Sequence, residues 1–169
     1  SRRRHTRSLC NWSSDVCSSD LASYTDVAGN TGGAGADTVT IDTKNPTLAV
    51  NIVDTSLNDG TNSSQVTFQF SETVSGFTVG DVSVSGGTLS NFSGSGNSYT
   101  AIFTATDGVE TTGSVSVAAA SYTDVAGNTG GAGADTVTID TKNPTLAVNI
   151  VDTSLNDGTN SSQVTFQFS

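Results

Sequence analysis

Apolar and polar residues alternate in short runs along most of the chain, a period-two pattern typical of half-buried strands. Seven such runs fall between residues 46 and 143, separated by turns rich in Gly, Asn and Asp. The residues expected to face the core are Leu48, Val50, Ile52, Val66, Phe68, Phe70, Val82, Val84, Leu89, Phe92, Tyr99, Ala101, Phe103, Ala105, Val115, Val117, Ala119, Val137 and Ile139. No stretch has a helical period. The pattern predicts an all-β fold, an antiparallel β-sandwich of about seven strands.

The chain repeats itself. Residues 22–71 and 120–169 are identical at all 50 positions, with an offset of 98 residues, and an offset of this size fits tandem domains that each have their own core. The only two prolines, Pro46 and Pro144, occupy equivalent positions. Proline suits the start of a strand after a linker, because it cannot donate to a sheet ladder. We therefore divide the chain, from residue 22 on, into the end of one repeat (22–45), one complete repeat (46–143) and the start of the next (144–169).

The first 21 residues differ sharply in composition from the rest. They contain every Arg of the chain, its single His and Trp, and both Cys. None of them aligns with the residues that precede the second copy of the repeat. The stretches SRRRHTR and WSSDVCSSDL instead match the translation of a common short-read sequencing adapter. We interpret residues 1–21 as a non-native leader produced by read-through of such an adapter, and we exclude them from the interpretation of fold and function.

The remainder is strongly acidic. From residue 22 on it has 14 acidic residues against two basic ones, Lys44 and Lys142, and it lacks Cys, His, Trp, Met and Arg. Such a surface repels nucleic acid and anionic lipid. No apolar run approaches the roughly 18 residues of a membrane-spanning segment. We therefore expect neither nucleic-acid binding nor direct membrane insertion.

Two stretches of the sequence carry a resemblance to a known family. FSETVSGFTVGDVSVSGGTLSNFSGSGNSYTAIFTAT and SYTDVAGNTG resemble bacterial Ig-like repeats, which occur in tandem in large secreted or surface-anchored adhesins. The resemblance covers essentially all of residues 22–169. It implies an Ig-like sandwich that acts as an extender, or stalk, in an extracellular, biofilm-associated or cell-surface adhesin, often stiffened by calcium. Its implied partners are the neighbouring identical repeats of the same chain, and it leaves the ligand of the adhesin unspecified.

Acidic and amide side chains gather in the loops between the predicted strands. The candidate Ca²⁺ ligands are Asp54, Asn58 and Asp59; Asp107 and Glu110; Asp124 and Asn128; and, at the linker, Asp140 and Asn143. Ca²⁺ takes about 6–8 oxygen ligands, which such turns can supply. In an Ig-like strand order the Asp124 loop faces the preceding repeat and the other clusters lie at the opposite end, so stacked repeats would bring the two ends together around an ion. The alternative is that these residues only form turns through Asx hydrogen bonds.

Catalysis has little support in this sequence. From residue 22 on there is no His or Cys to act as a base or nucleophile and no G-x-S-x-G motif, so we predict that the protein is not an enzyme. The glycine-rich segments 32–40 and 130–138 match a calcium β-roll repeat, but that pattern needs tandem copies and is better interpreted here as a loop. Two alternatives to the stalk stay open: a glycan- or protein-binding module, and an accessory domain of a secreted polysaccharide-degrading enzyme.

Overall fold

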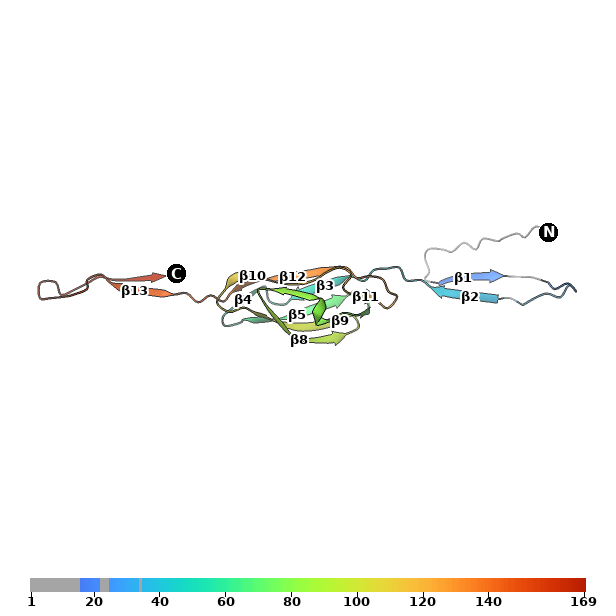
Figure 1. Cartoon of the computed structure of the whole chain (residues 1–169), viewed down its shortest axis with the longest axis horizontal. Helices are drawn as coiled ribbons and strands as arrows, with labels where there is room; N and C mark the ends of the chain where they lie inside the picture. The colour runs from blue at the N-terminus through green and yellow to red at the C-terminus, as the bar shows by residue number, and fades with distance from the viewer. Residues whose placement is uncertain (1–15, 22–24, 34) are drawn as a thin grey trace.

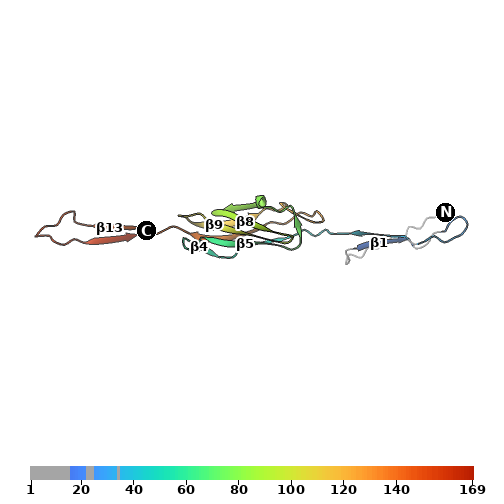
Figure 2. The same ribbon diagram turned by 90° about the horizontal axis from the view of Figure 1, so that it is seen from below.

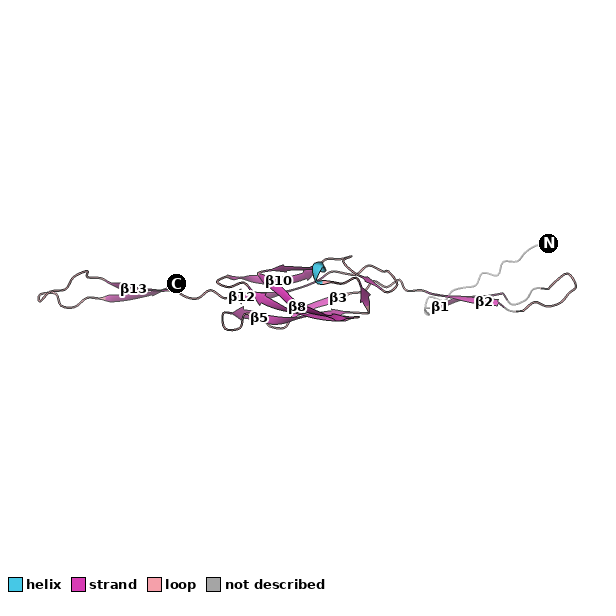
Figure 3. Cartoon of the chain, turned by 60° about the horizontal axis from the view of Figure 1, so that its bottom comes forward, coloured by secondary structure: helices cyan, strands magenta, loops and turns pink. Residues whose placement is uncertain are grey.

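Residues 16–21, 25–33 and 35–169 are described by the computed structural model. Residues 46–143, the central domain, form two four-stranded sheets packed face to face (Figures 1 and 3). The first sheet has the strand order β3-β5-β9-β8 and the second the order β4-β12-β10-β7. The bounds are Leu48–Ile52 for β3, Ser56–Asn58 for β4, Ser63–Phe70 for β5, Val82–Ser85 for β7, Gly87–Ser95 for β8, Ser98–Ala105 for β9, Glu110–Val117 for β10 and Gly133–Asp140 for β12.

The start of the domain contributes one strand to each of the two sheets. β3 pairs with β5 in the first sheet, and the chain then crosses to the second sheet, where β4 pairs in parallel with the last strand, β12. The other pairs within the two sheets are antiparallel. This division matches the arrangement of an Ig domain, with strands A, B, E and D in one sheet and C, F and G in the other. The predicted all-β, Ig-like sandwich is therefore confirmed.

Short elements complete the end of the domain that faces the N-terminus. β6 (Val74–Ser75) pairs antiparallel with β11 (Thr123–Asp124), and η1 (Val79–Asp81) is a single 3-10 turn, the one helical segment in the described part of the chain (Figure 3). The carboxylate of Asp81 accepts a hydrogen bond from the backbone N–H of Thr78 at 2.8 Å, which caps this turn. The β6–β11 pair places the segment that follows β5 beside the loop that follows β11.

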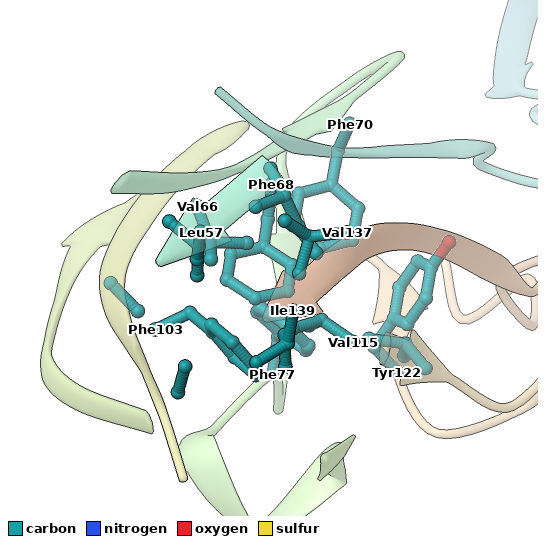
Figure 4. Packing of buried hydrophobic residues seen from close by; sticks show 14 of the residues in the cluster. Leu57, Val66, Phe68, Phe70, Phe77, Phe103, Val115, Tyr122, Val137 and Ile139 are labelled. Carbon is teal, nitrogen blue, oxygen red and sulfur yellow. The ribbon is translucent and has the colours of Figure 1, made fainter. Parts of the chain in front are cut away.

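The core lies between the sheets and is built largely from the alternating apolar residues (Figure 4). Phe68, Phe103 and Ile139 have 0% of their surface exposed. The aromatic rings form one connected cluster, in which neighbouring ring centroids lie 4.8–6.1 Å apart and most pairs meet edge to face. Its members are Phe68, Phe70, Phe77, Phe92, Tyr99 and Tyr122. Such pairs add about 0.5–1.5 kcal/mol each beyond burial of their area.

The core differs from the predicted one at a few positions. Leu57, Phe77 and Tyr122 are buried, although they lie in short elements or loops that have no alternating pattern. Ala119, expected to face the core, is exposed, because β10 ends at Val117 and the chain then turns away through Ala120, which has a φ of 65°. Within β10, the absence of a side chain at Gly113 leaves room for Ile139, because a Cβ at position 113 would lie 2.7 Å from the Ile139 side chain.

Two hairpins lie at opposite ends of the central domain (Figures 1 and 2). Toward the C-terminus, β13 (Leu146–Ile150) pairs with β14 (Val164–Phe168). Toward the N-terminus, β2 (Gly35–Thr40) pairs with β1 (Val16–Leu21), the last six residues of the leader; residues 1–15 lie outside the described part of the chain. Leu21 pairs with Gly35, whereas in the central domain the copy of that glycine, Gly133, pairs with Val117. Because the repeat offset makes Ala119 the equivalent of Leu21, β1 is displaced by two residues relative to β10.

Candidate metal centre at the domain junction

The loop from Asp124 to Asn128 is closed by its own side chains. The Asp124 carboxylate accepts hydrogen bonds from the backbone N–H and from the side-chain Nδ2 of Asn128, both at 2.8 Å. Gly127, at a φ of 95°, provides the left-handed turn between them. The identical loop from Asp26 to Asn30 has the same two bonds at the same distances. These contacts span only four residues, so the local sequence is sufficient to form the loop.

Tertiary contacts bury Asp124, which is only 3% exposed. Asp124 pairs with Val74 of β6, and Asn128 Nδ2 also donates to the backbone carbonyl of Asp42 at 3.1 Å, which fastens the incoming linker over the loop. Burial by itself raises the pKa of Asp124, but the hydrogen bonds from the Asn128 side chain and from the loop backbone outweigh burial and lower the pKa from its ordinary value of 3.8. Asp124 is therefore ionised at neutral pH.

Three acidic side chains converge at this junction. Asp42 comes from the linker, Glu72 from the segment between β5 and β6, and Asp124 from the end of β11, and one carboxylate oxygen of each lies within 4.8 Å of the others. Oxygens that bind one Ca²⁺ at about 2.4 Å are at most about 4.8 Å apart. The three carboxylates thus fit a calcium ion both in spacing and in the chemistry of their donor atoms.

The exposed side of the junction is an open hollow of about 390 Å³. Its lining residues are Thr40, Ile41, Asp42, Lys44, Ser71 and Glu72. The entry of the linker into the domain is held in place beside it. Pro46 is buried and its carbonyl accepts the Gly131 N–H at 2.9 Å, while the Ser71 N–H donates to the Thr47 carbonyl at 3.0 Å. Asp42 is therefore held beside the site in two ways. Asn128 donates to its carbonyl, and the domain anchors the linker a few residues further on, at Pro46 and Thr47.

The opposite end of the central domain contains most of the other candidate ligands. Glu110, Asp140 and Asn143 line a second hollow, of about 340 Å³, together with Lys142, Pro144 and Ser169. Asp140 is the register partner of both Glu110 and Asn58, in neighbouring strands of the second sheet. Asn58 Oδ1 accepts the N–H groups of Gly60 and Thr61 at 2.9 Å each, and so closes its own turn.

The structure thus brings together some of the predicted ligands and not others. Asp124 and Asn128 meet Asp42, which is the copy of Asp140 one repeat earlier. Asp54, Asp59 and Asp107 are exposed and belong to no group of three clustered acidic residues within the described ranges. The sequence analysis did not select Glu72. Its position directly after β5, at the end of the domain where the Asp124 loop also lies, is the signal that could have identified it.

Comparison with known proteins adds one finding. A family model described as "Bacterial Ig-like domain" matches residues 42–139, more than half of the chain. The match begins at Asp42, so it includes the linker residue that reaches the carboxylate cluster. No curated protein and no solved structure matches the chain. Within the described residues, no helix has the length and apolarity that crossing a membrane requires.

Proposed function

Because this chain belongs to the bacterial Ig-like domain family, whose non-catalytic modules are typical of surface and extracellular proteins, we propose that residues 22–169 are part of the stalk of a repetitive bacterial adhesin or biofilm-associated surface protein. The observation that carries this proposal is the identity of residues 22–71 and 120–169. A spacer needs length, and near-identical modules provide it. The linkers leave the central domain at opposite ends, which suits an extended array (Figure 1).

We further propose that Ca²⁺ binds at the junctions between repeats and stiffens the stalk. The closeness of Asp42, Glu72 and Asp124 supports this, because one of the three comes from the linker and two from the domain that follows. Bound together, they would hold the linker against the domain. Unbound, three carboxylates at this distance repel one another. The ion would supply positive charge, and Asn128 would keep both Asp124 and the linker carbonyl in place.

An undisturbed junction would contain a further carboxylate. Glu110 is the register partner of Asp140 at the second junction. By the repeat offset, the residue that corresponds to Glu110 at the first junction is position 12, which is Trp12 of the leader. In an array without the leader, the copy of Glu110 would stand beside Asp42. This extra acidic ligand would strengthen Ca²⁺ binding at native junctions relative to the junction in this chain.

Thermal melting of the full chain in Ca²⁺ and in chelator tests the calcium site. A ligand that binds only the folded state stabilises it by about 2.7 kcal/mol at 100 times its Kd, and about 1 kcal/mol raises the Tm of a domain of this size by about 4–8 °C. We expect Ca²⁺ to raise the Tm of the central domain and Asp42→Asn to abolish that increase. Asn retains the Oδ1 acceptor that the Lys44 N–H uses, so the linker turn is preserved.

Asp140→Asn is the matched control, because Asp140 has the same sequence neighbours as Asp42 but does not belong to the carboxylate cluster. It should leave the increase in Tm intact. An unchanged Tm in Ca²⁺ would remove calcium from the proposed function. Equal losses in the two variants would instead place the ion outside the cluster of Asp42, Glu72 and Asp124.

A further inference from the structure

Three Asp-Gly pairs lie in exposed turns, at residues 59–60, 107–108 and 157–158. In an Asp-Gly pair the backbone nitrogen of the glycine can reach the preceding side chain readily, because glycine has no Cβ and its backbone is flexible. From the different surroundings of the three pairs we infer that Asp107 is a site of spontaneous modification, where aspartate rearranges to isoaspartate. The modification loosens the exit of the chain from the central domain. The inference is independent of the proposed stalk and of the proposed calcium site.

The rearrangement is a condensation followed by a hydrolysis. The backbone nitrogen of Gly108 attacks Cγ of the Asp107 carboxylic acid, and a C–N bond forms as the C–OH bond breaks. The hydroxyl group leaves as water together with the amide proton, and a cyclic succinimide remains. Addition of water at Cγ restores aspartate. Addition at the main-chain carbonyl carbon breaks the original peptide C–N bond, so that the backbone runs through Cγ. The sum gains and loses no atoms and transfers no electrons, and water is the one co-reactant.

In two of the three pairs the glycine N–H is already engaged. Asn58 Oδ1 accepts the Gly60 N–H at 2.9 Å, and Asn156 Oδ1 accepts the Gly158 N–H at 2.9 Å. In each turn the same asparagine also exchanges backbone hydrogen bonds across the turn, at 2.9–3.1 Å. Attack by either glycine nitrogen must first break the bond to the asparagine side chain, and this slows the reaction at Asp59 and Asp157.

The pair at residues 107–108 has no such protection. Within the part of the chain that the structure describes, the Gly108 N–H donates no hydrogen bond. A Cβ at Gly108 would meet no atom within 4 Å, so there is room for the succinimide ring and for the water that opens it. Asp107 and Gly108 are both exposed. The Gly108 nitrogen is therefore free to attack without losing a partner.

The turn is fixed on both sides of this pair. Before it, the Thr106 N–H donates to the Gly86 carbonyl at 2.9 Å, and the Thr106 carbonyl accepts the Thr141 hydroxyl at 2.8 Å. After it, the Val109 N–H donates to Thr141 Oγ1 at 3.1 Å, and the Val109 carbonyl accepts the Thr141 N–H at 2.8 Å. Thr141 directly follows β12 and is 2% exposed.

Isoaspartate adds one carbon atom to the backbone between Thr106 and Val109. Both residues bond to Thr141, so the longer turn cannot keep all of these bonds at their present length. The expected result is a loosened contact between the β9–β10 turn and the segment that leaves the domain.

Prolonged incubation of the full chain at neutral pH in chelator tests the site. Isoaspartate has the same mass as aspartate, so it is measured by enzymatic methylation of isoaspartyl peptides and by their resistance to a protease that cleaves before aspartate. We expect isoaspartate to form at position 107 about fivefold faster than at positions 59 and 157, the rate factor that corresponds to breaking one hydrogen bond. Equal rates at the three positions, or none at position 107, would overturn the inference.

Asn156→Ala tests whether the side-chain hydrogen bond is the protecting feature. It removes the acceptor of the Gly158 N–H in a turn outside the central domain, so folding of that domain is not at risk. The rate at Asp157 should rise toward that at Asp107, while Asp59, in the unaltered copy of the turn, stays slow. An unchanged rate at Asp157 would contradict the physical reason given for the selectivity.

Asp107→Glu tests the consequence for the domain. Glutamate keeps the charge but would have to close a larger ring, so the variant should not rearrange at this position. After the same incubation, the isoaspartate-containing fraction of the unmodified chain should melt about 4–8 °C lower than fresh protein, the shift expected from losing the equivalent of one hydrogen bond. The Asp107→Glu chain should keep its Tm. An equal decline in both chains would show that modification at Asp107 does not loosen the exit.

Discussion

Residues 46–71 and 144–169 have the same sequence but different surroundings. Their hairpins pair in the same register, Leu48 with Phe70 and Leu146 with Phe168. Phe70 is 2% exposed, whereas Phe168 is 72% exposed. The local sequence is thus sufficient for strand pairing, and burial of the apolar face depends on strands contributed by residues 72–143.

The same two segments differ in secondary structure. Residues 56–58 form β4 because β12 lies beside them, whereas residues 154–156 form no strand and have only an isolated bridge from Asn156 to Thr159. β5 has eight residues and its copy β14 has five, since β9 extends the pairing of β5 alone. Identical residues therefore adopt different structures where the partner strand is distant in the sequence.

The largest difference between the two segments should appear on truncating their aromatic residues. Phe68→Ala opens a cavity in the core and should lower the free energy of unfolding of the central domain by about 3–5 kcal/mol. Phe166→Ala changes the equivalent residue, which is 62% exposed, and should have an effect within about 0.5 kcal/mol. Denaturant unfolding monitored by tyrosine fluorescence measures both. A large loss from Phe166→Ala would show that the C-terminal hairpin packs on the central domain.

Thr141 and its copy Thr43 should show a smaller difference. Thr141→Val retains the shape of the side chain but leaves the Thr106 carbonyl and the Val109 N–H without their partner, at a cost of about 1–3 kcal/mol. Thr43 is exposed, and Thr43→Val should be close to neutral. The same unfolding measurement compares the two. Equal effects would show that the hydrogen bonds of the Thr141 hydroxyl do not stabilise the central domain.

The smallest expected effect concerns pH. The folded-state pKa of Asp124 lies below 3.8, so folding favours its ionised form. The ionised Asp124 therefore stabilises the folded state above pH 3.8, and this stabilisation is lost as the pH falls through the folded-state pKa. Asp124→Asn should therefore lose less stability than the unmodified chain when acidified below 3.8, in Tm measurements made in chelator.

Asp26→Asn is the control for that measurement. The pKa of Asp26 is lowered by the same type of bonds, chiefly from the Asn30 side chain, but its loop lies outside the central domain. It should leave the acid sensitivity of the domain unchanged. A reduced sensitivity in this variant would show that the N-terminal segment and the central domain unfold together.

Local patterns in the sequence were sufficient to predict some elements of the structure and not others. The alternation of Val66, Phe68 and Phe70 was sufficient to predict a strand and its inward face, because the two faces of a strand follow a period of two. Leu57 has no such pattern around it, and its burial follows from the crossover to β12. Asp124 was selected because its loop is rich in Asp, Asn and Gly, but Glu72 has no comparable local signal.

By itself, the sequence determined the short strands, the register of each hairpin and the closed Asp–Asn loops, since all of these depend on residues that are near one another along the chain. Only the tertiary structure decided which copies are buried, that residues 56–58 become a strand, and that Asp42, Glu72 and Asp124 meet. These outcomes require two sheets to close over one core. They therefore depend on contacts between residues that are far apart in the sequence.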